Sequence, residues 1–137
     1  MELKNSMNIA VSGMKAQEMR LRVVAENIAN ADSLATTPGG EPYRRKLIEF
    51  SNIVDPQTKV SLLNVKRISR AQGELKVNFD PSHPAADKNG YVKMPNVNRF
   101  IETMDMKEAQ RSFSANLEVL EASRSMLRNT VNLLSSQ

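Results

Sequence analysis

The residue types that most often carry chemistry are sparse in this chain of 137 residues. It has no cysteine and a single histidine, His83, which stands between Ser82 and Pro84. Because no second imidazole or thiolate is present, the chain cannot assemble a zinc site, a thiol nucleophile or a disulfide. We therefore expect no metal ion and no cofactor, and no catalytic role for His83.

Carboxylates in the C-terminal third are the second group of residues that could carry chemistry. Glu102, Asp105 and Glu108 recur at steps of three, and Glu118 is followed by Glu121 at the same step. Paired carboxylates can act as a general acid and base. Basic residues are interspersed among these, however, and such mixtures on a helix usually form solvated pairs three or four residues apart. The sequence favours that reading and predicts that the chain is not an enzyme.

The chain also lacks a nucleotide-binding motif. The doublet Gly39-Gly40 is not followed by Lys-Ser/Thr, and it does not have the glycine spacing of a dinucleotide-binding motif. Basic residues gather in residues 32–99, with 11 Lys and Arg against 7 Asp and Glu, whereas the remaining ends are neutral. Tyr43 and Phe50 could stack on bases beside them. A small nucleic-acid-binding or adaptor module that uses this basic middle segment is therefore the alternative, although a net charge of +4 is a weak field.

The distribution of helix breakers divides the chain into three parts. All six prolines and four of the five glycines lie between residues 38 and 95. The flanking arms are free of proline and can form long helices. We predict a mainly α fold with a small β-rich insert, in which the N-terminal helix (1–31) and the C-terminal helix (100–137) pack as a coiled-coil-like pair around the middle segment (32–99).

Each arm carries a heptad seam with one polar interruption, and a polar seam residue commonly fixes helix register. The C-terminal helix is expected to begin near Thr103. Both arms also carry a second apolar set, which a simple helical hairpin would leave exposed to water. The predicted seam residues are Met7, Ala10, Met14, Gln17, Leu21, Val24 and Ile28 in the first arm, and Phe113, Leu117, Leu120, Arg124, Leu127, Val131 and Leu134 in the second. The second sets are Ile9, Val11, Ala16, Val23 and Ala25, and Ala115, Val119, Ala122, Met126 and Leu133.

The middle segment contains short runs that read as strands, at residues 43–50, 59–68 and 74–79. Asn89-Gly90 is a two-residue hairpin signal. Residues 1–19 are interrupted by polar residues, so no cleaved secretory signal is expected, and no apolar run is long enough to cross a membrane.

Three blocks carry a resemblance to a known family. They are Ala25 to Asp32 (AENIANAD) followed by PYRR at 42–45, Asp80 to Asn98 (DPSHPAADKNGYVKMPNVN), and Ser112 to Leu120 (SFSANLEVL). With these blocks the chain resembles the flagellar basal-body rod proteins, most closely those of the proximal rod, over nearly its whole length. The motif residues are Asn27, Asn30, Pro42, Tyr43, Arg44, Arg45, Asp80, Pro81, Asn89, Gly90, Tyr91, Pro95, Asn96 and Asn116.

The resemblance implies a structural subunit that polymerises through its terminal helices into the periplasmic drive shaft between motor and hook. It also implies export by the flagellar type III apparatus without a cleaved signal. The implied partners are copies of the chain, other proximal and distal rod subunits, the basal-body adaptor protein FliE, and the MS ring or export gate. Neither nucleic acid nor direct membrane insertion is expected. The excess apolar faces further predict that the free protein is partly disordered at both ends and orders on polymerisation.

Overall fold

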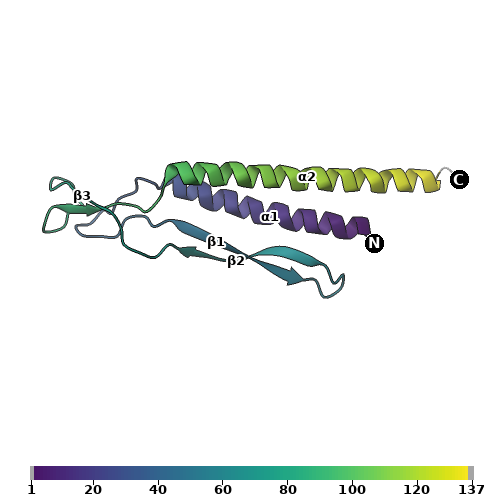
Figure 1. The fold of residues 1–137 in the computed structure, drawn as a ribbon, viewed down its shortest axis with the longest axis horizontal. Coiled ribbons are helices and arrows are strands. Elements are labelled where there is room, and N and C mark those ends of the chain that lie inside the picture. The colour runs from purple at the N-terminus through teal and green to yellow at the C-terminus, as the bar shows by residue number, and fades with distance from the viewer. Residues whose placement is uncertain (1, 136–137) are drawn as a thin grey trace. The chain divides into compact units, whose positions relative to one another are not determined.

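The computed structural model describes residues 2–135 and consists of two long terminal helices with four strands between them (Figure 1). This arrangement confirms the predicted mainly α fold with a β-rich insert. Met1 and Ser136–Gln137, at the outer ends of the predicted arms, lie outside the described residues. The elements are α1 (Glu2–Ala29), β1 (Lys46–Val54), β2 (Ser61–Arg70), β3 (Val77–Phe79), β4 (Tyr91–Lys93) and α2 (Arg99–Ser135).

Helix α1 ends at Ala29, and the side chain of the next residue, Asn30, adds a second hydrogen bond to a carbonyl of the last turn. The backbone N–H of Asn30 donates to the carbonyl of Glu26 at 3.0 Å, and its Nδ2 donates to the same carbonyl at 2.9 Å. The hydroxyl of Ser33 then donates to Asn30 Oδ1 at 3.0 Å. Side chains that bond the last carbonyls in this way terminate helices. Asn30, one of the motif residues, therefore caps the C-terminal end of α1.

Helix α2 begins four residues before the predicted start near Thr103. Asn98 caps it, because its Oδ1 accepts from the backbone N–H of Phe100 at 3.0 Å and of Ile101 at 3.3 Å. Thr103 lies inside the helix, where its hydroxyl donates to the carbonyl of Arg99 at 2.7 Å. Asn is among the best N-cap residues, and it satisfies the free N–H groups before the Thr can.

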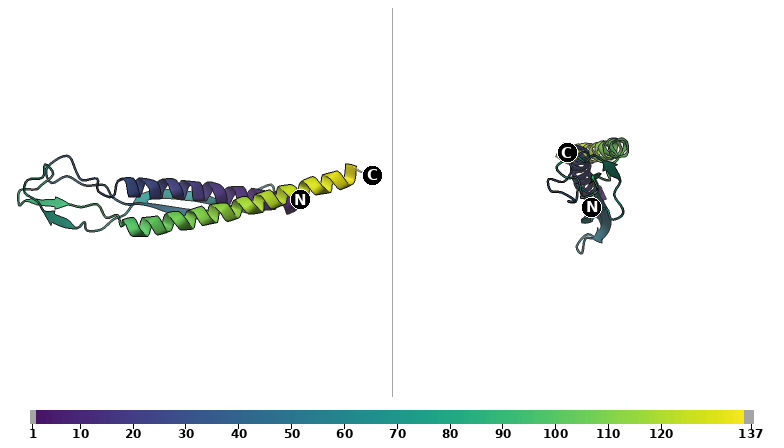
Figure 2. Two further views of the ribbon diagram at one scale, coloured as in Figure 1. Left: turned by 90° about the horizontal axis from the view of Figure 1, so that it is seen from above. Right: turned by 90° about the vertical axis from the view of Figure 1, so that its left-hand side faces the viewer.

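The chain divides into two compact units. Unit 1 contains residues 2–21, 49–67 and 107–135, which are the first part of α1, most of the β1–β2 hairpin and most of α2. Within this unit the start of α1 and the end of α2 lie at the same end, so the helices are antiparallel, and they lie side by side in both Figure 1 and Figure 2. Strand β2 is tied to α1 by the N–H of Leu63, which donates to Ser12 Oγ at 3.2 Å.

Unit 2 contains residues 22–48 and 68–106. Its small antiparallel sheet pairs β3 with β4 and brings Phe79 opposite Tyr91. Their rings meet edge to face with centroids 5.3 Å apart, a geometry that contributes about 1 kcal/mol beyond area burial. Val92 and Ala85 are buried in this unit, each with 2% of its surface exposed.

The prediction of a two-residue hairpin at Asn89-Gly90 is wrong. Strands β3 and β4 are connected by residues 80–90, a loop in which Asp87 Oδ1 accepts from the N–H of Asn89 at 2.8 Å and of Tyr91 at 2.9 Å. Gly90 has a φ of 83° and ends the loop. The predicted third strand, 74–79, is shortened to β3; directly before it, the carbonyl of Lys76 accepts from the N–H of Met94 at 2.8 Å.

Candidate assembly interface

The contact between α1 and α2 in unit 1 is built on small residues. A Cβ placed on Gly13 would lie only 2.8 Å from Nδ2 of Asn116, so the backbone of α1 approaches α2 directly at this point. Nδ2 of Asn116 in turn donates to the carbonyl of Ser112 at 3.0 Å. Among the described residues of unit 1, the buried ones are Ala10, Gly13, Ala16, Ala109 and Ser123.

A core of Ala, Gly and Ser leaves the larger predicted seam residues at its margin. Buried members are Ala10 and Val24; half-buried members are Met7, Met14, Gln17, Leu21, Ile28, Phe113 and Leu120; exposed members are Leu117, Arg124, Leu127, Val131 and Leu134. Gln17 Oε1 is buried without a hydrogen-bond partner among the described residues.

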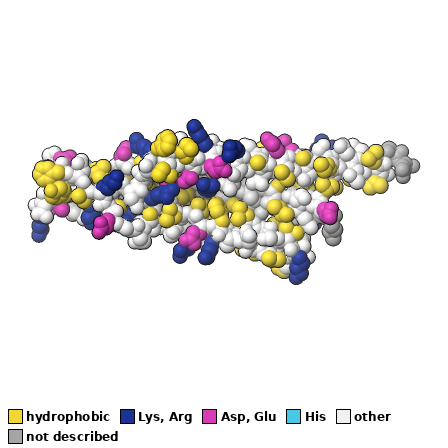
Figure 3. Space-filling model, in the orientation of Figure 1, with side chains coloured by type: hydrophobic (Ala, Val, Ile, Leu, Met, Phe, Trp, Pro, Cys, Tyr) yellow, Lys and Arg dark blue, Asp and Glu magenta, His cyan; other side chains and the backbone are white. Residues whose placement is uncertain are grey.

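The last part of α2 extends past the start of α1 (Figure 1). With Gly13 level with Asn116 and the helices antiparallel, Glu2 is level with about residue 127. Residues 128–135, which we call the projecting segment, therefore have no part of α1 beside them. Every described residue from 124 onward is exposed, and Figure 3 shows hydrophobic side chains on this end of the helix.

The second apolar set of α2 is uncovered within the chain, as predicted. Val119, Met126 and Leu133 are 50%, 57% and 71% exposed. The corresponding prediction for α1 is wrong for Ala16 and Val23, which are buried. Ala16 is covered because it faces the β1–β2 hairpin across a groove in unit 1.

A buried polar cluster in unit 2 is organised by Asn27, which is 1% exposed. Its Nδ2 donates to the carbonyl of Lys46 and to Glu102 Oε2, both at 3.0 Å. Its Oδ1 accepts from the Tyr43 hydroxyl and from the N–H of Lys46, both at 2.8 Å. An amide side chain has two donor hydrogens and two acceptor lone pairs. Asn27 therefore uses its full capacity inside the chain and has none left for a neighbouring molecule.

The carboxylate of Glu102 is buried, which corrects the prediction of a solvated helix pair. Glu102 is 0% exposed and is bonded by Asn27 Nδ2 and by Nε of Arg45. Arg45 also reaches Asp105 with Nη2 at 3.3 Å. The solvated reading holds for Glu108, which forms an exposed pair with Arg111 at 3.3 Å.

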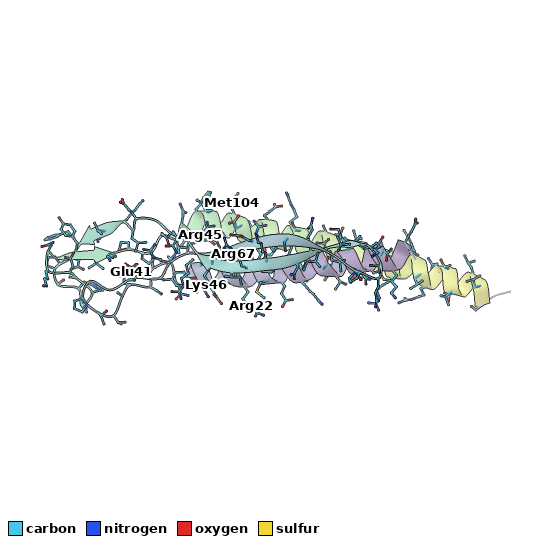
Figure 4. All side chains as sticks on the ribbon, turned by 90° about the horizontal axis from the view of Figure 1, so that it is seen from below. Arg22, Glu41, Arg45, Lys46, Arg67 and Met104 are labelled. Carbon is cyan, nitrogen blue, oxygen red and sulfur yellow. The ribbon has the colours of Figure 1, made fainter. Side chains whose placement is uncertain are left out.

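Strand geometry explains why two consecutive basic residues have different partners. Arg45 directly precedes β1 and Lys46 is its first residue, and successive side chains of an extended chain point to opposite sides. Arg45 therefore points to the carboxylates of α2, while Lys46 points to Glu26 on α1 (Figure 4). The apolar periodicity of the helices did not indicate this cluster. The sequence feature that pointed to it was the family-like block PYRR at 42–45, which contains Tyr43, Arg44 and Arg45.

Other motif residues hold the turns of unit 2. Arg44 Nη1 donates to the carbonyl of Gly73 at 3.0 Å, and Asn96 Oδ1 accepts from the N–H of Arg45 at 2.8 Å. Hydrogen bonds from Lys93 and then Arg44 hold the pKa of Glu41 below its usual value. Burial raises the pKa of the Tyr43 hydroxyl. Pro42 is buried and Pro95 is half-buried.

The loop before β4 is held by its own acidic side chains. Asp80 Oδ1 accepts from the Ser82 hydroxyl at 2.7 Å, which lowers the pKa of Asp80. A Cβ on Gly90 would lie 3.0 Å from Pro81 and from Phe79, so only glycine fits both the positive φ and the space. Asn89 and Tyr91 are exposed.

The residues singled out for chemistry have structural partners. His83 Nδ1 accepts from the N–H of Ala85 at 3.0 Å. Within residues 2–135, no three His, Asp or Glu side chains gather as a metal site, and neither helix carries a stretch suited to crossing a bilayer.

Several basic residues of the middle segment are paired with acidic side chains. Arg44 pairs with Glu41 at 3.0 Å, and Arg67 pairs with Glu49 at 2.7 Å. Arg45 and Lys46 are paired as described above. A nucleic-acid surface needs basic groups free to meet phosphates, and the alternative of a nucleic-acid-binding or adaptor module is not supported.

Paired terminal helices that bury few side chains between them and expose large apolar faces are typical of subunits that assemble with other subunits. The protein families that match this chain agree with this class. Residues 7–33 match the family described as flagella basal body rod protein, and residues 88–133 match the flagellar basal body rod FlgEFG protein C-terminal family.

Three curated relatives are each named flagellar basal-body rod protein FlgC. The one from Agrobacterium fabrum is 46% identical, with 98% of this chain and 96% of the relative covered. The Salmonella typhimurium protein is 42% identical over 97% of this chain and 98% of its own length. The Borreliella burgdorferi protein is 37% identical over 98% and 99%. The chain belongs to the FlgC family of flagellar basal-body rod proteins.

Proposed function

We propose that the chain is a structural subunit of the proximal rod that polymerises through α1 and α2 into the shaft transmitting torque from motor to hook. Membership of the FlgC family makes it a flagellar rod component and implies a structural protein, not an enzyme. The observation that carries the assembly mode is the exposed apolar surface of α2. Leu127, Val131 and Leu134 are 44%, 55% and 73% exposed, and patches of this kind mark interaction sites.

Subunit contacts that do not close on themselves generate helical assemblies, and each subunit then needs different surfaces for different neighbours. The heptad row of α2 and its second apolar set supply two such surfaces. In the proposed assembly the terminal helices of neighbouring subunits form a tube, and the middle segment lies outside it. The proposed partners are copies of the chain, other rod subunits, the adaptor FliE, and the MS ring or export gate.

The proposed location is the periplasmic part of the basal body. The chain would reach it through the flagellar type III apparatus without cleavage of a signal. The proposal includes neither contact with nucleic acid nor insertion into the membrane.

The test is incorporation of a tagged chain into basal bodies in a motile host that lacks its own FlgC-family protein. We expect the wild-type chain to restore motility and to co-purify with the rod. Leu127→Asp should block both, because a carboxylate would enter a dry helix contact. Leu21→Asp should do the same from α1.

Asn129→Asp is the matched control, since Asn129 is exposed and lies on the side of α2 opposite Leu127. The purified Leu127→Asp and Asn129→Asp variants should give the same circular dichroism spectrum as the wild-type chain, because both sites are exposed. Normal motility of both Leu127→Asp and Leu21→Asp would refute the assembly surface.

A further inference from the structure

A groove in unit 1 lies between α1 and the β1–β2 hairpin. It has a volume of about 540 Å³. Its walls are mostly apolar and include Val11, Met19, Leu62 and Leu63. We call it the hairpin groove. Lys15 also lines it and is the only charged residue to do so within residues 2–135.

Gly13, where α1 contacts α2, is not among the residues that line the groove. The α1 residues of the groove recur at helical spacing from Asn8 to Met19, whereas the contact with α2 runs through Gly13. Positions that recur at three and four residues share one face of a helix. The groove is therefore open to a further helix without displacing α2.

The projecting segment and the residue before it form the matching half. Leu127, Val131 and Leu134 are spaced i, i+4 and i+7, the anchor spacing by which an amphipathic helix lies in an apolar groove. All three are exposed. Every residue of the projecting segment is exposed.

The projecting segment cannot reach the groove of its own chain. It lies beyond residue 2 of α1, whereas the groove is lined by residues 8–19 of that helix. Helix α2 is continuous from Arg99 to Ser135 and contains neither Pro nor Gly, so it has no residue at which to fold back. A second copy of the chain can supply the segment.

Charge also fits this pairing. The last turn of α2 has no basic residue, so the partial negative charge on its free carbonyls is not compensated within the helix. Lys15, which is exposed at the groove, would place a cation beside that helix end. Cations at helix C-termini are stabilising.

We propose that the end of α2 from one copy docks in the hairpin groove of the next copy, with Leu127, Val131 and Leu134 as anchors and Lys15 at the helix end. The proposal rests on the proposed function, since it names the partner of the α2 surface. The contact joins two different surfaces, so repeating it gives an open, head-to-tail assembly.

The absence of cysteine from the chain allows a direct test. Two differently tagged copies, one with Asn64→Cys in the groove and one with Leu134→Cys on α2, are co-expressed in the motile host, and isolated basal bodies are oxidised. We expect about tenfold more mixed disulfide dimer than with Asn64→Cys and Asn129→Cys, because a disulfide forms only when the Cα atoms lie within about 7 Å. Asn129 lies on the opposite side of α2.

A second variant tests the charge. Lys15→Glu should reduce the mixed dimer about two- to fivefold, whereas Lys107→Glu, an exposed charge reversal outside the groove, should leave it unchanged. Equal dimer yields from the Leu134→Cys and Asn129→Cys copies would overturn the docking, as would a disulfide formed with a different rod protein in place of the second copy. Absence of the wild-type chain from basal bodies would instead refute the proposed function.

Discussion

Asn116 on α2 lies directly over the backbone of Gly13 on α1, so close that a Cβ on Gly13 would come within 2.8 Å of the Asn116 amide nitrogen. In unit 2, Asn27 and Glu102 meet at 3.0 Å. In each unit an Asn side chain therefore lies at the contact between the two helices, Asn116 of α2 in unit 1 and Asn27 of α1 in unit 2.

The Gly13–Asn116 contact predicts a reversal of sign between two backgrounds. Alanine in place of a helical glycine stabilises by about 1 kcal/mol, but here the added Cβ must push Asn116 off its bond to Ser112. We expect Gly13→Ala to lower the free energy of unfolding by about 1 kcal/mol in the wild-type chain, and to raise it by about the same amount when Asn116→Ala is also present. Urea unfolding measures both. An identical effect of Gly13→Ala in the two backgrounds would contradict the contact.

The buried carboxylate of Glu102 predicts a large loss on truncation. Glu102→Ala removes the charge that faces Arg45 and an acceptor of Asn27, and should cost about 3 kcal/mol of unfolding free energy. Glu102→Gln should cost less, since it can still accept from Asn27. Glu108→Ala is the control, because its exposed pair with Arg111 should contribute less than about 1 kcal/mol. Equal losses at Glu102 and Glu108 would show that the cluster is not buried.

The loop before β4 should weaken in acid. Backbone hydrogen bonds from Tyr91 and then Asn89 hold the pKa of Asp87 below its usual value. A carboxyl whose pKa is lower folded than unfolded contributes stability above its unfolded pKa and loses it as the pH falls through the folded value. Titration of the Asp87 carboxyl by NMR should therefore give a lower pKa than in a peptide of residues 85–92. A pKa equal to the peptide's would contradict the bonds.

Hydrogen exchange should separate the free chain from the assembled one. We expect weak protection of residues 5–30 and 105–134 in dilute solution, with the fastest exchange from residue 124 onward, where every described side chain is exposed. Protection of these ranges should rise on polymerisation. Strong protection in the dilute chain would contradict the expectation that assembly orders the arms.

The sequence predicted the helices well because proline and glycine are confined to the middle and the arms show regular apolar spacing. It placed the start of α2 too late, because the cap is the side chain of Asn98 and a single Asn carries little signal within a polar stretch. The uncovered second apolar set of α2 was also predictable, since no other arm of the chain could cover it.

The interior of the helix pair was not predictable from periodicity. Hydrophobic patterning favours the largest apolar residues as the seam, yet unit 1 is packed through Ala10, Gly13 and Ala109. Small side chains bury little surface and look neutral in such a pattern. Glu102 was missed for a related reason, because a carboxylate on a charged helix resembles a surface residue until the strand that carries Arg45 is placed beside it.

The saturated hydrogen bonding of Asn27 has a consequence for genetics. A residue with no free donor or acceptor can affect motility only through the folding of its own chain, so the phenotype of Asn27→Ala should depend on temperature and be relieved by growth in the cold. Leu127→Asp, which alters only a surface, should be immotile at every temperature. The temperature dependence of a mutant would thus distinguish residues that build the subunit from residues that join it to its neighbours.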